Sequence, residues 1–323
     1  MDARQLLYAT GVLLPPMIKP PRLRRGDLVA VVSPSSAVTQ DLQGQFERGV
    51  AALESLGLRV RVEDHVMDRH YYSAGTAAAR IDDLHRAWAD PNVAMVLMSQ
   101  GGQTANNLLD SLDYDLFRRQ PKIFMGMSDG TTLLTAITSQ SGIVTFHGPD
   151  LLFGFGRHMS EPFIDQFRSV VMDGACGPVL SPTFRTIRQG AATGLLYGGH
   201  VNILIDTMFA GFEPDLNGSI LFLEGTHSIA ELDRQFNALR LHGVFAQISG
   251  LILGYFDGHR LPDAVMNRAP ADIIREITQS YDFPIIEIGE LGHNVENFVL
   301  PVGIQSTIDT TRGSFRLNDA AVV

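Results

Sequence analysis

The sequence predicts an α/β protein made of two successive α/β units. Short apolar runs alternate with segments of helical periodicity through the first half of the chain, which is typical of a parallel sheet with helices on both faces. A glycine- and proline-rich stretch interrupts the alternation near the middle, and the alternation then resumes. The length of 323 residues also favours about two domains.

Each strand expected in the first half is an apolar run that ends at a turn signal. The run at 27–32 is almost continuously apolar, as a parallel strand buried on both faces requires. A helix follows, with apolar residues at helical spacing from Phe46 to Leu56 and Gly57 as its stop signal. The other expected elements are strands at 58–62, 93–98 and 122–125 and helices at 77–88, 108–117 and 131–140.

Regularity falls away between residues 155 and 193, which predicts a linker or crossover. We therefore expect an N-terminal α/β domain at 18–160, a linker at 161–193 and a C-terminal domain at 194–323. Within the C-terminal domain we expect strands at 219–223, 248–255 and 284–288, helices at 229–239 and 271–281, and a terminal hairpin at 306–318.

Composition narrows the class of function. Hydrophobic residues make up 45% of the chain and charged residues 19%, so a well-formed core is expected. The net charge is −10 and no dense basic stripe is present, which argues against a nucleic-acid partner. The single cysteine, Cys176, excludes an intramolecular disulfide and fits a cytoplasmic, reducing location. No run of about 18 apolar residues predicts a membrane span.

The apolar stretch at 6–14 resembles the core of a signal peptide. Its core is short, Asp2 weakens the basic flank, and Pro15 and Pro16 follow where small residues would mark a cleavage site. We therefore expect an N-terminal extension, or a start at Met17, rather than secretion.

The stretch Gly126-Met127-Ser128-Asp129-Gly130 matches the G-x-S-x-G pattern and lies between an expected strand and an expected helix. A sharp turn there would expose the Ser128 hydroxyl as a nucleophile. The free N–H groups of the helix N-terminus, that of Asp129 first, would stabilise an oxyanion. The motif alone fits equally well a serine or aspartate that only caps the helix.

A serine nucleophile requires a base and an acid that orients it. His293 follows the strand expected at 284–288, and Glu224 follows the strand at 219–223, where a buried carboxylate needs a partner. Taken in chain order, these residues predict a Ser128–Glu224–His293 triad. His147 is a further histidine expected to line a cleft, although a structural role remains the alternative for each histidine taken alone.

Gly101 and Gly102 follow the strand expected at 93–98, where their backbone N–H groups would supply a second oxyanion donor. An ordinary turn between strand and helix is the alternative. The sequence has no H-E-x-x-H, no pair of C-x-x-C motifs, no phosphate-binding loop and no tight group of histidines. We therefore expect neither a metal nor a cofactor.

At these residues the chain resembles the family of serine peptidases that contains the LD-carboxypeptidases and the microcin C immunity peptidase. The resemblance runs from about Met17 onward through ordered blocks that include GDLVAVVSPSS, GMSDGTTLLTAI, TFHGPD, GLLYGGHVN, ILFLEGTHS and GHNVENFVLPVG. It implies that Ser128 is the nucleophile, Glu224 the acid and His293 the base, with the N–H groups around Gly102 and Asp129 as the oxyanion hole.

The resemblance also implies an N-terminal flavodoxin-like parallel-sheet domain joined to a smaller C-terminal α/β domain, with the site between them. It implies a homodimer and a reaction without a metal. It displaces an α/β-hydrolase, which shares the G-x-S-x-G pattern and the chain order of the triad, as the expected fold.

Departures from the family pattern concern the substrate. LD-carboxypeptidases usually carry an arginine before the paired glycines, whereas Ser99 and Gln100 precede Gly101 here. Together with TFHGPD, this resembles the microcin-immunity branch more closely. Gly101, His200 and Asn202 are the positions expected to bind the substrate. His200 replaces the asparagine of the family's GGN, while Asn202 matches a substrate-contacting position. The tryptophan on which immunity peptidases stack a nucleotide base has no match, because the single tryptophan is Trp88 in the N-terminal half.

These observations together predict a cytoplasmic serine carboxypeptidase or amidase that cleaves an amide bond next to a terminal amino acid. The substrate is a murein LD-peptide or a microcin C-like peptidyl- or aminoacyl-nucleotide, and the sequence does not separate them. A biosynthetic acyltransferase with the same triad and a non-catalytic binding protein on the same scaffold are the alternatives.

Overall fold

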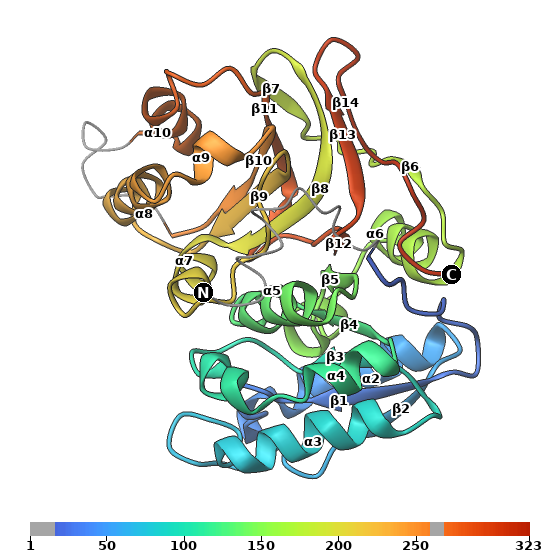
Figure 1. Ribbon diagram of the computed structural model, residues 1–323. Coiled ribbons are helices and arrows are strands. Elements are labelled where there is room, and N and C mark those ends of the chain that lie inside the picture. The colour runs from blue at the N-terminus through green and yellow to red at the C-terminus, as the bar shows by residue number, and fades with distance from the viewer. Residues whose placement is uncertain (1–16, 259–267) are drawn as a thin grey trace.

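The computed structural model describes residues 17–258 and 268–323 and contains two sheets, one above the other in Figure 1. The apolar stretch at 6–14 lies outside the described residues. The mixed α/β class predicted from the sequence is confirmed. Across the described part of the chain, no helix combines the length and the apolarity that crossing a bilayer requires.

The first sheet is largely parallel and has six strands in the order β12-β5-β4-β3-β1-β2. Its first five strands in sequence lie in the order 2-1-3-4-5, which is the flavodoxin-like arrangement. Only β12 runs antiparallel, and it pairs with β5 through Pro301 and Phe146. The strands are β1 (Leu28–Val32), β2 (Arg59–Val62), β3 (Val93–Met98), β4 (Ile123–Gly126), β5 (Thr145–His147) and β12 (Leu300–Val302).

Helices connect these strands much as predicted, with one exception. The single helix expected at 108–117 is two pieces, because Leu112 is extended and the Asp113 side chain accepts a hydrogen bond from Leu116 N, which starts a new helix. The helices are η1 (Gln40–Leu42), α2 (Gln43–Ser55), α3 (Ala77–Ala89), η2 (Ala105–Ser111), α4 (Tyr114–Arg119) and α5 (Gly130–Ser141).

The second sheet has eight strands in the order β6-β14-β13-β8-β9-β10-β11-β7. The four central strands, β8 to β11, are parallel. The predicted terminal hairpin forms β13 and β14, which lie between β8 and the edge strand β6. The strands are β6 (Gly177–Pro178), β7 (Arg185–Arg188), β8 (Ala191–His200), β9 (Ile220–Gly225), β10 (Gly250–Phe256), β11 (Ile285–Gly292), β13 (Gln305–Asp309) and β14 (Ser314–Leu317).

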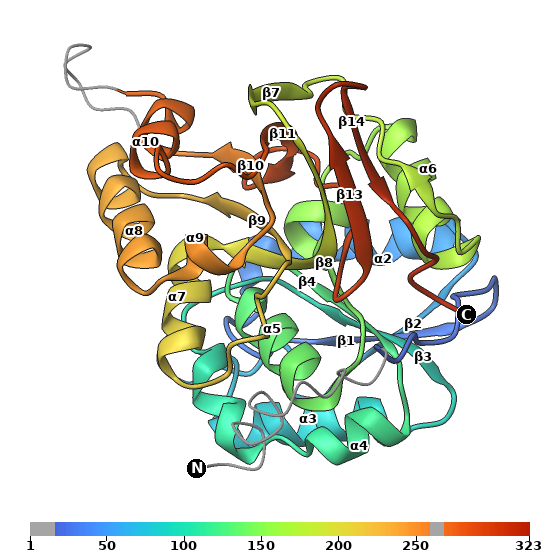
Figure 2. The ribbon, with the colours of Figure 1, turned by 45° about the horizontal axis from the view of Figure 1, so that its top comes forward.

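The helices of this half are α7 (Val201–Phe209), α8 (Ile229–Leu241), α9 (Val244–Gln247) and α10 (Pro270–Ile277). The last three gather on one side of the second sheet (Figure 1). Both views place α5 beside α7 (Figures 1 and 2), and α5 also contacts β4 and β5 of the first sheet and β8 of the second, so both halves hold the helix that follows Ser128. The helix α10 ends at Ile277, four residues before the predicted end at 281.

The stretch 161–193 is more regular than its composition indicated. It contains the edge strands β6 and β7 and the helices α6 (Glu161–Phe167) and η4 (Arg168–Met172), and η3 (Leu151–Phe155) precedes it. Strand β8 was also missed, because glycines interrupt its apolar run. A side chain at Gly198 would place its Cβ 1.9 Å from Phe222 O, so close strand packing explains that glycine. The division at 18–160, 161–193 and 194–323 stays a prediction.

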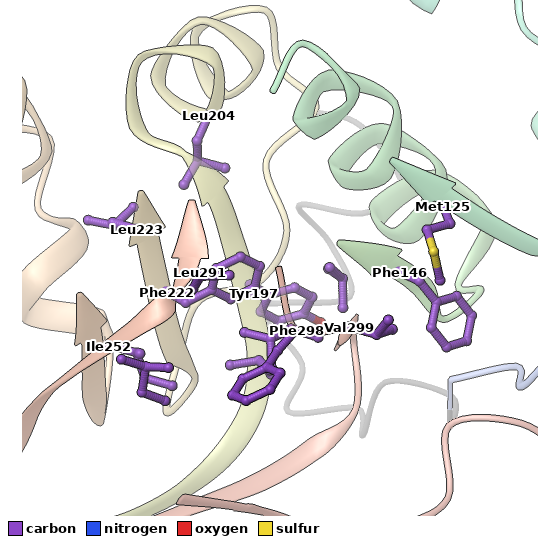
Figure 3. Packing of buried hydrophobic residues seen from close by; sticks show 14 of the residues in the cluster. Met125, Phe146, Tyr197, Leu204, Phe222, Leu223, Ile252, Leu291, Phe298 and Val299 are labelled. Atoms are coloured by element: carbon purple, nitrogen blue, oxygen red, sulfur yellow. The ribbon is translucent and has the colours of Figure 1, made fainter. Parts of the chain in front are cut away.

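A continuous apolar core joins the two sheets (Figure 3). Met125 and Phe146 of the first sheet belong to the same buried cluster as Phe222 and Ile252 of the second. A separate cluster fills the opposite face of the first sheet around Trp88, which is fully buried and donates its indole N–H to Gln120 O at 2.7 Å. This tryptophan is therefore a core residue.

Candidate active site

The turn between β4 and α5 holds Ser128 in a strained conformation. Its φ of 58° is in the left-handed region, where a side chain is unfavourable. No side chain of the described residues caps α5, so the helix-cap reading of Ser128 and Asp129 is not what this turn shows. A strained serine between a strand and a helix is the geometry of a nucleophile elbow.

The backbone of the glycine pair after β3 lies directly against this turn. A Cβ on Gly101 would approach the Ser128 Cβ to 2.7 Å and the Asp129 N to 3.3 Å. A Cβ on Gly102, whose φ is +150°, would approach the Ser35 Oγ to 2.2 Å. Both positions therefore require glycine. Of the two predicted oxyanion donors, Gly102 lines the same pocket as Ser128, and Asp129 directly follows Ser128 in the chain.

The buried carboxylate of Asp129 links the start of α5 by hydrogen bonds to the loop after β1 and to the loop after β3. Sequence reasoning missed this role. The Asp129 Oδ2 accepts hydrogen bonds from Ser35 Oγ at 2.5 Å, Thr104 N at 2.7 Å and Ala105 N at 2.9 Å. Charge-assisted bonds of this kind are stronger than neutral ones. The start of α5 is thus anchored to the loops that follow β1 and β3, and the glycine pair is held in place.

Glu224 and His293 form a buried pair at the carboxyl edge of the second sheet. Glu224 lies near the end of β9 and is fully buried, and His293 directly follows β11. The His293 Nδ1 and Glu224 Oε2 atoms are 2.8 Å apart. Because β9, β10 and β11 are parallel, their carboxyl ends meet at one edge, which explains how residues 69 positions apart become partners.

Glu224 and His293 each stabilise the charged form of the other. Burial opposes ionisation of Glu224, but the imidazoles of His200 and His293 and the hydrogen bond from His293 outweigh it and lower the pKa of Glu224 to about 2. Burial alone would lower the pKa of His293, whereas the Glu224 carboxylate holds it above its usual value. The acid is therefore ionised and favours a protonated imidazole.

Ser128 and His293 line one pocket of about 270 Å³. Its walls come from the glycine pair, the turn before α5, the loop after β5 and the loop after β11, so both halves of the chain contribute. The lining residues are Ser36, Gln100, Gly101, Gly102, Met127, Ser128, Asp150, Phe153, Arg157, Gly292, His293, Asn294, Val295 and Asn297.

His200 and Asn202 are not among those lining residues, so their contact with substrate stays a prediction. His200 ends β8 and is buried, with its ring centroid 5.1 Å from that of His293. One ligand atom each from His200, Glu224 and His293 lies within 4.8 Å of the others. No motif in the sequence marks this group, because strand pairing and not local spacing assembles it.

Comparisons with known proteins identify the family of this chain. A family model described as the LD-carboxypeptidase N-terminal domain matches residues 29–148, and one described as the LD-carboxypeptidase C-terminal domain matches residues 193–308. Together they span more than half of the chain. The chain belongs to the LD-carboxypeptidase family. It is a serine-type carboxypeptidase of the group whose relatives are named for murein peptides or microcin.

Relatives cover nearly the full length of this carboxypeptidase. A putative carboxypeptidase of Vibrio cholerae is 30% identical over 91% of this chain and 96% of its own. The microcin C7 self-immunity protein of Escherichia coli is 29% identical over 91% of this chain and 93% of its own. The probable murein peptide carboxypeptidase of Bacillus subtilis is 29% identical over 90% and 92%.

Solved structures show the same two-domain architecture. The microcin C7 self-immunity protein superposes with a TM-score of 0.88 at 25% identity, over 95% of this chain and 100% of that one. A complex of that immunity protein with aspartyl sulfamoyl adenosine gives a TM-score of 0.87 at 25% identity, over 95% and 100% of the two chains.

His147 does not lie where the sequence analysis expected it, in the wall of a cleft. It ends β5 but is fully buried in the core, with its ring centroid 5.2 Å from that of Phe222, so it does not line the pocket. Burial lowers its pKa to about 4, and both ring nitrogens lack a hydrogen-bond partner among the described residues. The expectation that His147 faces a cleft was wrong, because its ring packs against Phe222 in the core that joins the two sheets.

The pocket also contains functional candidates that sequence reasoning missed. Arg157 places its guanidinium 5.2 Å from the Phe153 ring centroid and donates to Asn294 Oδ1 at 3.3 Å. Asp150 is buried, accepts hydrogen bonds from Phe153 N and Gly154 N, and has a pKa raised to about 6 by that burial. No motif marks Arg157, whereas Asp150 belongs to the TFHGPD block.

Proposed function

We propose that Ser128, Glu224 and His293 form a catalytic triad that cleaves an amide bond next to a terminal amino acid. The observation that carries the proposal is one pocket lined by a strained serine, by a histidine paired with a buried carboxylate, and by a glycine pair packed on the serine. These are the parts that acyl transfer through a serine requires.

In the proposed mechanism, the Nδ1 of His293 is engaged by Glu224, which leaves Nε2 for Ser128. The imidazole takes the hydroxyl proton while Ser128 Oγ attacks the carbonyl carbon. The N–H groups of Gly102 and Asp129 hold the oxyanion. The imidazolium, stabilised by ionised Glu224, then protonates the departing amine. Water repeats the sequence on the acyl-enzyme and releases the acid.

Recognition of a terminal carboxylate is proposed for Arg157. Its guanidinium is exposed at the pocket and is oriented by Asn294 and Phe153. Gln100 also lines the pocket, but its amide donates to Ala37 O at 2.6 Å and is committed to the fold. A guanidinium binds a carboxylate through two parallel hydrogen bonds, which would set the distance between the terminal residue and Ser128.

A murein LD-peptide is the substrate that this pocket favours, because it offers a free carboxylate to Arg157 and needs no base-stacking tryptophan. Trp88 is fully buried and is not available for stacking. An aminoacyl-nucleotide is the second candidate, supported by Phe153, an exposed aromatic ring in the pocket, and by the likeness to the microcin immunity protein. A cytoplasmic location and a homodimer are proposed on the family resemblance.

The test is mass spectrometry of the products that the protein forms from a murein LD-tetrapeptide and from an aminoacyl-sulfamoyl adenosine. The Ser128→Ala variant should form none, while Ser111→Ala, which alters an exposed serine, should match the wild type. Loss of the terminal D-residue identifies a murein peptidase, and release of the sulfamoyl nucleoside identifies an immunity-type enzyme. Transfer to an added amine would favour the acyltransferase, and binding without turnover would overturn the enzymatic proposal.

A further inference from the structure

We propose that His200, Glu224 and His293 together form a binding site for a divalent transition-metal ion, Zn²⁺ above all, and that occupancy of this site switches the peptidase off. The binding part of the inference stands on the geometry of these three residues. The inhibitory part rests on the proposed function, because two of the ligands are the proposed acid and base.

The ligand set has the chemistry and the proximity that zinc requires. One donor atom from each residue lies within 4.8 Å of the other two. Zinc binds imidazole nitrogen and carboxylate oxygen at about 2.0–2.2 Å, so adjacent ligands of a tetrahedral site stand about 3.4 Å apart. Modest side-chain rotations therefore suffice. Two histidines and one carboxylate also leave a fourth position open for water.

Unsatisfied buried atoms provide a second, independent indication. Glu224 Oε2 is engaged by His293, but Glu224 Oε1 and His200 Nδ1 are both buried without a hydrogen-bond partner among the described residues. Glu224 is 0% exposed and His200 is 4% exposed. Buried polar atoms without partners are unfavourable, and native proteins usually satisfy them. An ion that these residues ligate through those atoms would be their partner.

The backbone holds the ligands in register. His200 and Glu224 are directly paired residues on the adjacent parallel strands β8 and β9. His293 directly follows β11, and its side chain is 22% exposed at the pocket, which gives an ion a route inward. Positions on paired strands hold ligands more precisely than positions on loops.

Occupancy would disable the triad for a geometric reason. The ion would displace the proton between His293 Nδ1 and Glu224 Oε2, and the imidazole would become a ligand instead of a base oriented toward Ser128. Imidazole donors favour Zn²⁺ over Mg²⁺ and Ca²⁺, so the latter two should not inhibit.

The test uses the untagged, full-length Ser128→Ala protein, treated with a chelator and desalted, and titrates it with Zn²⁺ by calorimetry and with Co²⁺ by visible absorption. We expect one ion per chain and the intense absorption bands of four-coordinate Co²⁺. His200→Asn should weaken binding at least about tenfold, because loss of a direct ligand should cost no less than the loss of a group that only orients one, which typically costs about 10- to 100-fold. His227→Gln is the matched control, because its ring lies 5.1 Å from that of His200 outside the ligand set.

One further variant removes an ambiguity. His65, Asp82 and Asp83 form a second group of potential ligands near the surface, so the titration is repeated with His65→Gln. If binding is lost with His65→Gln and retained with His200→Asn, the proposed site is wrong. If neither the Ser128→Ala protein nor its His65→Gln derivative binds Zn²⁺ or Co²⁺, the proposed site is also wrong.

The inhibition is measured on the Ser128-containing protein as the zinc concentration that halves each variant's own zinc-free rate. His200→Asn should raise that concentration at least about tenfold, in line with its binding. Zinc binding that depends on His200 in a protein without turnover would contradict the proposed function and leave the site standing. Turnover that is insensitive to zinc would contradict the switch and leave the proposed function standing.

Discussion

Replacing Gly101 with alanine tests whether the glycine pair positions the nucleophile. The added Cβ would stand 2.7 Å from Ser128 Cβ and 2.9 Å from Ser128 Oγ, while ordinary contact begins at 3.4 Å. The two groups must therefore separate by about 0.7 Å. Because displacements near 1 Å at a reacting atom reduce rates about 100-fold, we expect kcat/KM to fall about 100-fold, or about 2.7 kcal/mol.

The fold should survive this substitution. Overpacking costs about 1–3 kcal/mol, against a usual stability of about 5–15 kcal/mol. The assay is kcat/KM on the peptide that the wild type cleaves, with circular dichroism and urea unfolding to verify the fold. Gly44→Ala is the control, because its Cβ would meet only the end of the Arg48 side chain at 3.5 Å. A folded Gly101→Ala enzyme with the wild-type kcat/KM would refute the positioning argument.

Other consequences are open to measurement. The free energy of unfolding measured in urea should be about 1 kcal/mol higher for Ser128→Gly than for Ser128→Ala, because only glycine adopts a φ of 58° without strain. Equal free energies for the two variants would contradict the strain argument. Asp129→Ala should lower the free energy of unfolding by about 3 kcal/mol and slow turnover, since three donors lose their acceptor, and an unchanged urea midpoint would contradict this. Glu224→Gln should reduce kcat about 10³- to 10⁴-fold in steady-state kinetics without raising KM, because His293 loses its orienting acid; activity near wild type would exclude the triad. Arg157→Ala should raise KM for a peptide with a free carboxylate by about tenfold or more but leave KM for the same peptide amidated unchanged, with partial rescue by lysine. Equal effects on both peptides would contradict carboxylate recognition.

Elements with strong local signals were predictable from the sequence. Apolar runs marked β1, β3, β4, β9 and β10, and Gly142, with a φ of 71°, ended α5 where expected. Strand β8 was missed because Gly194, Gly198 and Gly199 dilute its apolar pattern, although close approach of neighbouring groups is the reason for them. Strand β12 was missed because it is short and joins the first sheet from far along the chain.

The candidate site shows the same division between local and long-range information. The G-x-S-x-G turn is a local pattern, and the structure confirms the junction between strand and helix around Ser128. The Asp129 carboxylate, the Arg157 guanidinium and the approach of His200 to His293 all depend on pairing between distant segments. No spacing in a single sequence reports such pairing, so these features became visible only in the folded chain.

The most direct test of the central claim, that Ser128 is the nucleophile, is mass spectrometry of the intact protein after reaction with a fluorophosphonate, followed by peptide mapping. We predict a single adduct on Ser128, absent from Ser128→Ala and formed more slowly in His293→Ala, whose serine lacks its base. An adduct on another serine, or a folded wild-type protein that forms none while cleaving its substrate, would contradict the account.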